Sequence, residues 1–124
     1  MSHHILIADD DRDFTSVLRE LLEGFGYKVT CAHDGVVAYE LAQKIKPNLI
    51  ILDWKMPSGK GSAVLEMLRE KQLTKEIPVI ILSGASEPGM DAWAKSLGVK
   101  ARFQKPYEAQ KLLGAVKNIL DPAN

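Results

Sequence analysis

Acidic side chains end two of the short apolar segments in this sequence. Asp53 comes directly after residues 49–52, and three aspartates at 9–11 come directly after residues 5–8. One of these three acids is enough to cap a following helix, so two remain to face Asp53. Carboxylates held together raise each other's pKa unless a cation lies between them. Mg²⁺ suits such a group, because it binds one or two carboxylates and keeps places for water and phosphate oxygens.

A hydroxyl group and an ammonium group follow two further apolar segments. Ser83 comes directly after residues 79–82, and residues 101–103 lead to Lys105, which stands before Pro106. Each has an ordinary explanation by itself, since a serine can satisfy a strand end and most lysines are solvated. Together with the aspartates they predict a site that handles a phosphoryl group, whose charge a metal ion, an ammonium and a hydroxyl would meet.

These side chains meet only if the segments before them are parallel strands of one sheet. A short, continuous apolar segment such as residues 49–52 is typical of a strand that is buried on both faces. Strand and helix patterns alternate five times, which predicts an α/β fold of five βα units with helices on both faces of the sheet. Ligands of such sheets bind at the carboxyl edge. The expected strands are 5–8, 28–32, 48–53, 79–82 and 101–103.

Helices are expected where apolar residues recur at helical spacing. In the first helix this spacing is expected to turn one set of apolar residues toward the sheet, and Gly26 ends the helix. The set is Phe14, Val17, Leu18, Leu21, Leu22 and Phe25. Asp34 is expected to cap the second helix. The fourth and fifth helices are expected over residues 90–97 and 107–120.

The composition is that of an ordinary globular domain, and we expect one domain over residues 1–124 with a core from about 4 to 120. Sixteen basic and sixteen acidic residues give no net charge, so there is no electrostatic case for binding nucleic acid or an anionic membrane. The apolar segments are too short to cross a membrane, and the first residues lack the features of a signal peptide. With Cys31 as its single cysteine, the chain fits a cytoplasmic protein.

Four motifs, in order along the chain, carry a resemblance to a known family. They are Ile5-Leu6-Ile7-Ala8-Asp9-Asp10, Asp53-Trp54-Lys55-Met56-Pro57 with Gly61, Ser83-Gly84-Ala85, and Lys105-Pro106-Tyr107. With these motifs the chain resembles, from about residue 4 to 120, the CheY-like receiver domain of two-component response regulators. The resemblance implies a flavodoxin-like, doubly wound (βα)5 sandwich whose parallel strands follow the order 2-1-3-4-5.

The resemblance also implies a function in phosphorelay signalling. Asp53 would be the phosphoacceptor, which takes a phosphoryl group from a sensor histidine kinase or a phosphotransfer protein. Ser83 would hydrogen-bond the phosphoryl group, and Lys105 would pair with it. The domain would catalyse only its own phosphorylation and its own dephosphorylation, so we do not expect an enzyme that acts on a separate substrate.

A magnesium site is the third implication of the resemblance. Asp10 and Asp53 would ligate Mg²⁺ directly, together with the backbone carbonyl of Lys55. Asp9 would act mainly through a water molecule.

Receivers of this family commonly signal through the face that the fourth helix, fifth strand and fifth helix form. A downstream target protein or a second receiver would bind there, and we expect Trp93, Arg102 and Tyr107 on this face. Helical spacing turns Trp93 outward, as an aromatic anchor for the partner. The alternative is that its ring folds over the edge of the sheet as peripheral core, because large aromatic side chains are seldom left wholly exposed. Arg102 departs from the family, whose members usually carry Tyr or Phe three residues before the site lysine. An arginine cannot bury its charge cheaply, so a switch based on burying a ring is not expected.

Two alternatives remain open. Residues 11–15 fit the Asp-x-Asp-x-Thr pattern of haloacid-dehalogenase-like phosphatases, which would make Asp11 and Asp13 the reactive acids. That pattern is short, and neither a later acidic pair nor a cap domain accompanies it. The other alternative is a receiver that docks to partners without being phosphorylated, and the complete set of acids argues against it.

Overall fold

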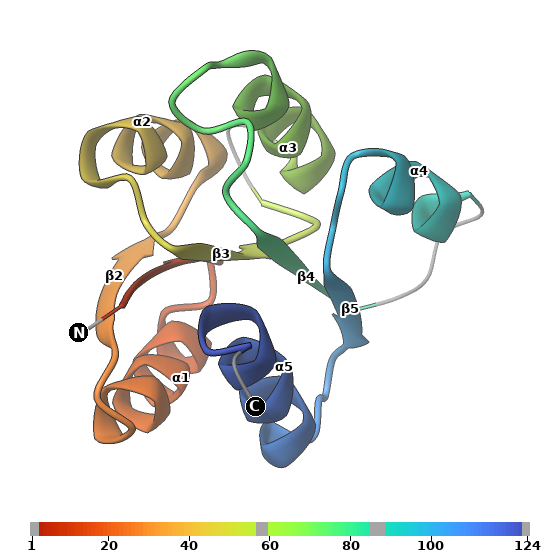
Figure 1. Ribbon diagram of the computed structural model, residues 1–124. Helices are drawn as coiled ribbons and strands as arrows, with labels where there is room; N and C mark the ends of the chain where they lie inside the picture. Colours follow the sequence, from red (N-terminus) through yellow and green to blue (C-terminus); the bar gives the residue numbers. More distant parts are fainter. Residues whose placement is uncertain (1–2, 57–59, 85–88, 123–124) are drawn as a thin grey trace.

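The computed structural model describes residues 3–56, 60–84 and 89–122, and in these residues strands and helices alternate from β1 to α5 (Figure 1). The strands form one parallel sheet in the order β2-β1-β3-β4-β5. This order confirms the predicted doubly wound fold. The elements are β1 His4–Ala8, α1 Arg12–Gly24, β2 Lys28–Ala32, α2 Gly35–Ile45, β3 Leu49–Asp53, α3 Gly61–Glu70, β4 Val79–Ser83, α4 Met90–Ser96, β5 Ala101–Gln104 and α5 Ala109–Leu120.

Helices cover both faces of the sheet, with α1 and α5 on one face and α2, α3 and α4 on the other (Figure 1). All five residues of β3 are buried, and so are all five of β4. Alternate residues of β3 enter different cores: Ile50 and Leu52 pack with α2, α3 and α4, while Leu49 and Ile51 pack with α1 and α5. Burial on two faces explains why this strand is continuously apolar.

Local signals fix where the first two helices begin and end. Asp11 caps α1 by accepting a hydrogen bond from the Phe14 N–H at 3.0 Å, and Asp34 caps α2 by accepting one from the Val37 N–H at 2.8 Å. Gly26 follows α1 with a φ of 92°, a conformation that glycine adopts at low cost. The predicted cap at Asp34 and the stop at Gly26 are confirmed.

The predicted inward positions of Val17 and Phe25 are wrong. Val17 is 65% exposed and Phe25 is 50% exposed. The side of α1 that faces the sheet carries Thr15, Leu18 and Leu22, all of them buried. Val17 is one residue from Leu18 and therefore points about 100° away from it around the helix axis. Phe25 lies beyond the last turn of α1, at its C-cap.

The fourth and fifth helices are shorter than predicted. Helix α4 ends at Ser96, and α5 begins at Ala109 because Glu108, its N-cap residue, has extended backbone angles. No helix among the described residues is long and apolar enough to span a bilayer.

Gly61 lets the first turn of α3 approach the end of β3 closely. Its N–H donates to the Trp54 carbonyl at 2.8 Å. A Cβ at this position would lie 2.8 Å from the Trp54 Cα and would also collide with the Asp53 carbonyl oxygen. Both neighbours are backbone atoms at the edge where the aspartates gather, so they cannot move without moving that edge.

We expect Gly61→Ala to lower the free energy of unfolding by about 1 to 3 kcal/mol, because the added methyl overpacks a rigid contact. Gly114→Ala is the matched control: Gly114 lies inside α5 and a Cβ there meets open space, so the substitution should stabilise by about 0.5 to 1 kcal/mol. Urea unfolding of the two variants measures both effects. Equal stabilities would contradict the close approach at Gly61.

Candidate acidic and phosphoryl site

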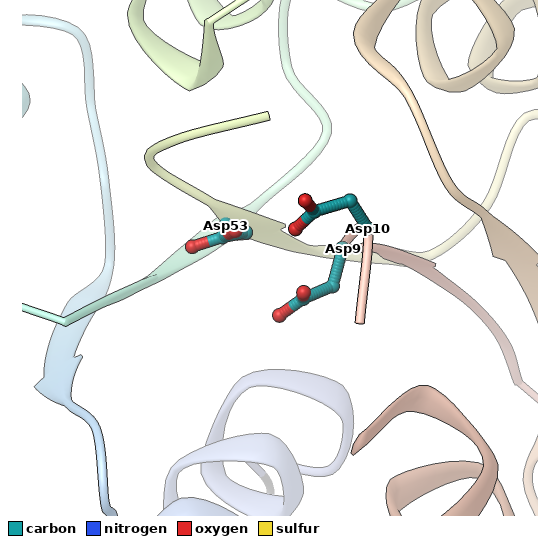
Figure 2. A group of neighbouring side chains, drawn as sticks. All are labelled: Asp9, Asp10 and Asp53. Carbon is teal, nitrogen blue, oxygen red and sulfur yellow. The ribbon is translucent and has the colours of Figure 1, made fainter. Parts of the chain in front are cut away.

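The sheet brings three carboxylates together at its carboxyl edge, as Figure 2 shows. Asp53 is the last residue of β3, and Asp9 and Asp10 follow the last residue of β1. One carboxylate oxygen from each residue lies within 4.8 Å of the others. Asp9 is 1% exposed and Asp53 is 6% exposed, whereas Asp10 is open to solvent. Hard oxygen ligands at this spacing suit Mg²⁺.

Backbone hydrogen bonds hold the two buried acids in place. The Asp9 N–H donates to the Ala32 carbonyl at 3.0 Å, which extends the pairing of β1 with β2 past the end of β1. Asp53 is itself inside β3 and pairs with Leu82 of β4. Both acids are thereby fixed by the sheet rather than by a flexible loop.

Lys105 supplies a positive charge to this acidic group. Its Nζ lies 2.6 Å from Asp9 Oδ2 and 3.7 Å from Asp53 Oδ1. The other oxygen of Asp9 accepts a hydrogen bond from the Asp11 N–H at 3.0 Å. The ammonium in this structure therefore pairs chiefly with Asp9, and the Lys105–Pro106 peptide bond that follows it is cis.

Burial and charge act in opposite directions on the two reactive groups. The pKa of Asp53 is raised to about 6: burial raises it most, the Asp9 carboxylate also raises it, and the Lys105 charge and the Lys55 N–H lower it. For Lys105, burial lowers the pKa, but the hydrogen bond and charge of Asp9 and the charge of Asp53 outweigh it, so the pKa is raised. Lys105 is therefore a cation at neutral pH, while Asp53 bears an ionised charge that one ammonium only partly balances.

Ser83 contributes a hydroxyl group that lacks a partner. The residue ends β4, is 2% exposed, and its Oγ makes no hydrogen bond with the residues that the structure describes. A buried hydroxyl without a partner is uncommon. The Ser83 carbonyl accepts a hydrogen bond from the Lys105 N–H at 2.7 Å, which ties the end of β4 to the residue that carries the ammonium.

The structure thus brings together Asp9, Asp10, Asp53 and Lys105, as the sequence predicts, and places Ser83 at the end of the neighbouring strand. Lys55 is exposed in the turn after β3. The remaining motif residues Pro57 and Ala85 lie outside the described residues.

Phe14 is a neighbour of the site that the sequence analysis placed only in the core. Its ring lies under the ammonium of Lys105, with Nζ 4.4 Å from the ring centroid. The two residues are 91 positions apart in the sequence. No local spacing relates two residues so distant, so only the tertiary structure, which brings the residue after β5 to the first turn of α1, reveals the contact.

Trp93, Arg102 and Tyr107, which we expect on the face of the fourth helix, fifth strand and fifth helix, are all half-buried. Trp93 is half-buried, and its ring packs edge-on against Trp54 with 5.1 Å between ring centroids. Arg102 forms a two-pronged ion pair with Asp91 of α4. Tyr107 belongs to the core on the opposite side of the sheet, where α1 and α5 pack.

The phosphatase alternative is not favoured by the geometry. The Asp11 side chain caps α1, and Asp13 is exposed on the first turn of that helix. Thr15 is buried inside α1, where its hydroxyl donates to the Arg12 carbonyl at 3.1 Å. The pattern at residues 11–15 is therefore the start of a capped helix.

Comparisons with known proteins identify the family of the chain. The family model of the response regulator receiver domain matches residues 5–117. Sporulation initiation phosphotransferase F of Bacillus subtilis is 33% identical over 120 residues, which cover 97% of this chain and 95% of that protein. Transcriptional regulatory protein CpxR of Escherichia coli is 36% identical over 116 residues, and the chain spans only 48% of its length.

A solved structure extends the agreement to the fold. The CheY-like response regulator receiver domain protein of Methanospirillum hungatei superposes with a TM-score of 0.91, at 26% identity, over 98% of this chain and 96% of that one. Phosphorylation on an aspartate is the function of the family that the sequence model identifies. The chain belongs to the receiver domain family of two-component response regulators.

Proposed function

We propose that Asp53 is the phosphoacceptor of this receiver and that it takes its phosphoryl group from a sensor histidine kinase or a phosphotransfer protein. One observation carries the assignment: Asp53 is the acid at the end of β3 whose carboxylate lies near both the ammonium of Lys105, at 3.7 Å, and the carboxylates of Asp9 and Asp10. Asp9 has both oxygens engaged by Lys105 and by the Asp11 N–H. Asp53 has the freer oxygens, which a nucleophile needs.

In the proposed reaction, an oxygen of the Asp53 carboxylate attacks the phosphorus of phosphohistidine. The phosphorus–nitrogen bond breaks, its electron pair stays on the imidazole nitrogen, and Asp53 becomes an acyl phosphate. Lys105 would leave Asp9 to pair with an oxygen of the transferred group, and the unpartnered Ser83 hydroxyl would donate to another. Later attack by water on the phosphorus would release inorganic phosphate and restore Asp53.

Receiver domains bind Mg²⁺ at an acidic pocket of this kind, and the residues present fit that ion. Asp10 and Asp53 are our proposed direct ligands, with the Lys55 backbone carbonyl. Asp9 would act through water, because its oxygens already accept hydrogen bonds from Lys105 and Asp11. When bound, Mg²⁺ would neutralise carboxylate charge and draw phosphate oxygens toward the site.

We place the reaction in the cytoplasm, where kinases have access to ATP.

For the output we propose the surface of α4 and β5 near Asp91 and Arg102, with a downstream protein or a second receiver as partner. Trp93 of α4 contacts Trp54, the residue that follows β3 and Asp53. Asp91 of α4 forms an ion pair with Arg102 of β5. A shift of the residues around Asp53 would therefore change how α4 is held. Tyr107, which is half-buried and precedes α5, would extend this surface toward α5.

The phosphoacceptor is tested with acetyl phosphate and Mg²⁺, followed by intact-mass measurement. The wild-type protein should gain one phosphoryl group, and Asp53→Asn should gain none because the amide is not a nucleophile at this site. Asp13→Asn should be modified like the wild type, since Asp13 is exposed on α1. A stoichiometric phosphoryl group on Asp53→Asn would refute the assignment.

The metal site is tested by stability with and without magnesium. In metal-free buffer at pH 7, Asp53→Asn should be more stable than the wild type, on the order of 1 to 2 kcal/mol, because the raised pKa of Asp53 makes its ionised form costly in the folded state. The cost arises as pH increases from about 4, where the unfolded chain ionises, to about 6. The difference should therefore vanish below pH 4.

Millimolar Mg²⁺ should reverse this order, because binding stabilises the folded wild type by mass action. Asp10→Asn should lose most of the gain, and Asp13→Asn should keep it. Thermal midpoints that do not change with Mg²⁺ would contradict the metal site.

The output surface is tested by tryptophan fluorescence in single-tryptophan variants. Trp54→Phe leaves only Trp93 on α4, and Trp93→Phe leaves only Trp54 beside Asp53. Phosphorylation should change the emission of both, since the two rings are in contact. If mass measurement shows full phosphorylation and the Trp93 emission is unaltered, α4 does not respond and the proposed output surface is wrong.

A further inference from the structure

The ammonium of Lys105 is surrounded by two carboxylates and one aromatic ring. Its Nζ lies 2.6 Å from Asp9 Oδ2, 3.7 Å from Asp53 Oδ1 and 4.4 Å from the centroid of Phe14. The Lys105 side chain is 25% exposed, so the ring occupies part of the space that water would otherwise fill. A cation within about 6 Å of a ring centroid is attracted by the negative face of the ring.

We propose that Phe14 is a positioning residue, whose ring holds the Lys105 ammonium beside the phosphoacceptor and lets it pass from Asp9 to the phosphoryl group. This role rests on the proposed function, in which Lys105 pairs with the group on Asp53. An aromatic face suits the task because it attracts a cation without accepting a hydrogen bond in a fixed direction. The N–H groups of Lys105 stay available, and the ammonium can exchange one oxygen for another while remaining over the ring.

The position of the Phe14 ring is itself fixed by the acidic segment of the site. Asp11 accepts the Phe14 N–H at 3.0 Å, and the Asp11 N–H donates to Asp9 at 3.0 Å. The cap that starts α1 therefore sets the distance between Asp9 and Phe14. On its other side the ring meets Tyr107 edge-on, with 5.6 Å between centroids and an interplanar angle of 85°, an arrangement that aromatic pairs prefer.

The space beside the ring explains why an aliphatic side chain would not serve equally well. A pocket of about 330 Å³ is lined by Phe14, Lys105, Pro106, Tyr107 and Ala109. A smaller side chain at position 14 would open this pocket to the ammonium. Water would then hydrate the Lys105 charge and compete with the phosphoryl oxygens for its N–H groups.

The chain offers an internal control for this contact. Phe25, at the other end of α1, lies under the ammonium of Lys117 of α5, with Nζ 4.6 Å from the ring centroid. The two pairs have similar distances between ammonium and ring centroid, and their rings lie at the two ends of the same helix. Only the pair at Phe14 and Lys105 lies beside the acids.

The experiment replaces Phe14 by mono-, di- and trifluorinated phenylalanine and measures the rate of phosphorylation by acetyl phosphate at saturating Mg²⁺. Fluorine withdraws charge from the ring face and changes its shape little, so the rate should fall stepwise, by about three- to tenfold across the series. Phe14→Leu should be at least as slow, and Phe14→Tyr should recover the rate to within about twofold because it keeps the ring face. The same fluorinated series at Phe25 should leave the rate unchanged.

A purely structural role for Phe14 would not follow ring charge, and unfolding midpoints of the fluorinated proteins check that each is folded. Equal rates across the Phe14 series, or an equal loss across the Phe25 series, would overturn the positioning role. Failure of the proposed function gives a different result, since the wild-type protein would then carry no phosphoryl group on Asp53.

Discussion

Two buried carboxylates share one ammonium, so the site carries more negative than positive charge, and the fold must hold these charges close together. Asp9 and Asp53 are removed from water at the ends of adjacent strands, and Lys105 lies 2.6 Å from the first and 3.7 Å from the second. The Asp9 carboxylate repels the carboxylate of Asp53 and raises the pKa of Asp53. Only a rigid scaffold can keep these two repelling carboxylates close together, and the parallel sheet with its two covering layers of helices is such a scaffold. The uncompensated charge is what makes the edge attractive to a divalent cation.

Much of this arrangement could be predicted because the relevant signals are local or repeat along the chain. Continuous apolar segments identified the buried strands, Asp34 identified a helix start, and residues at strand ends identified the acidic group. Contacts between side chains of different elements could not be predicted in this way. Trp93 packs edge-on against Trp54, and Tyr107 packs edge-on against Phe14. Helical spacing predicts which residues lie on the same side of a helix, but not how much of the helix surface the neighbouring elements cover.

Helix α4 is attached to the sheet by two contacts of different chemistry. The rings of Trp93 and Trp54 meet in an apolar setting, where contact is weakly directional. Arg102 and Asp91 form a two-pronged ion pair at the surface, where Asp91 is 73% exposed and the pair is worth little in stability. Arg102 thus keeps its charge in contact with solvent and protein at once. That placement agrees with the expectation that an arginine at this position is not buried as an aromatic ring would be.

Asp53 belongs to β3, which lies between β1 and β4 in the middle of the sheet. The next residue continues the ladder, since the Trp54 N–H donates to the Leu82 carbonyl at 2.9 Å. The backbone that carries the Asp53 carboxylate is therefore held by strands on both sides. A group bound at this carboxylate would meet a rigid backbone, so the proposed response would come mainly from side chains that move toward it, with Asp53 as the fixed point of reference.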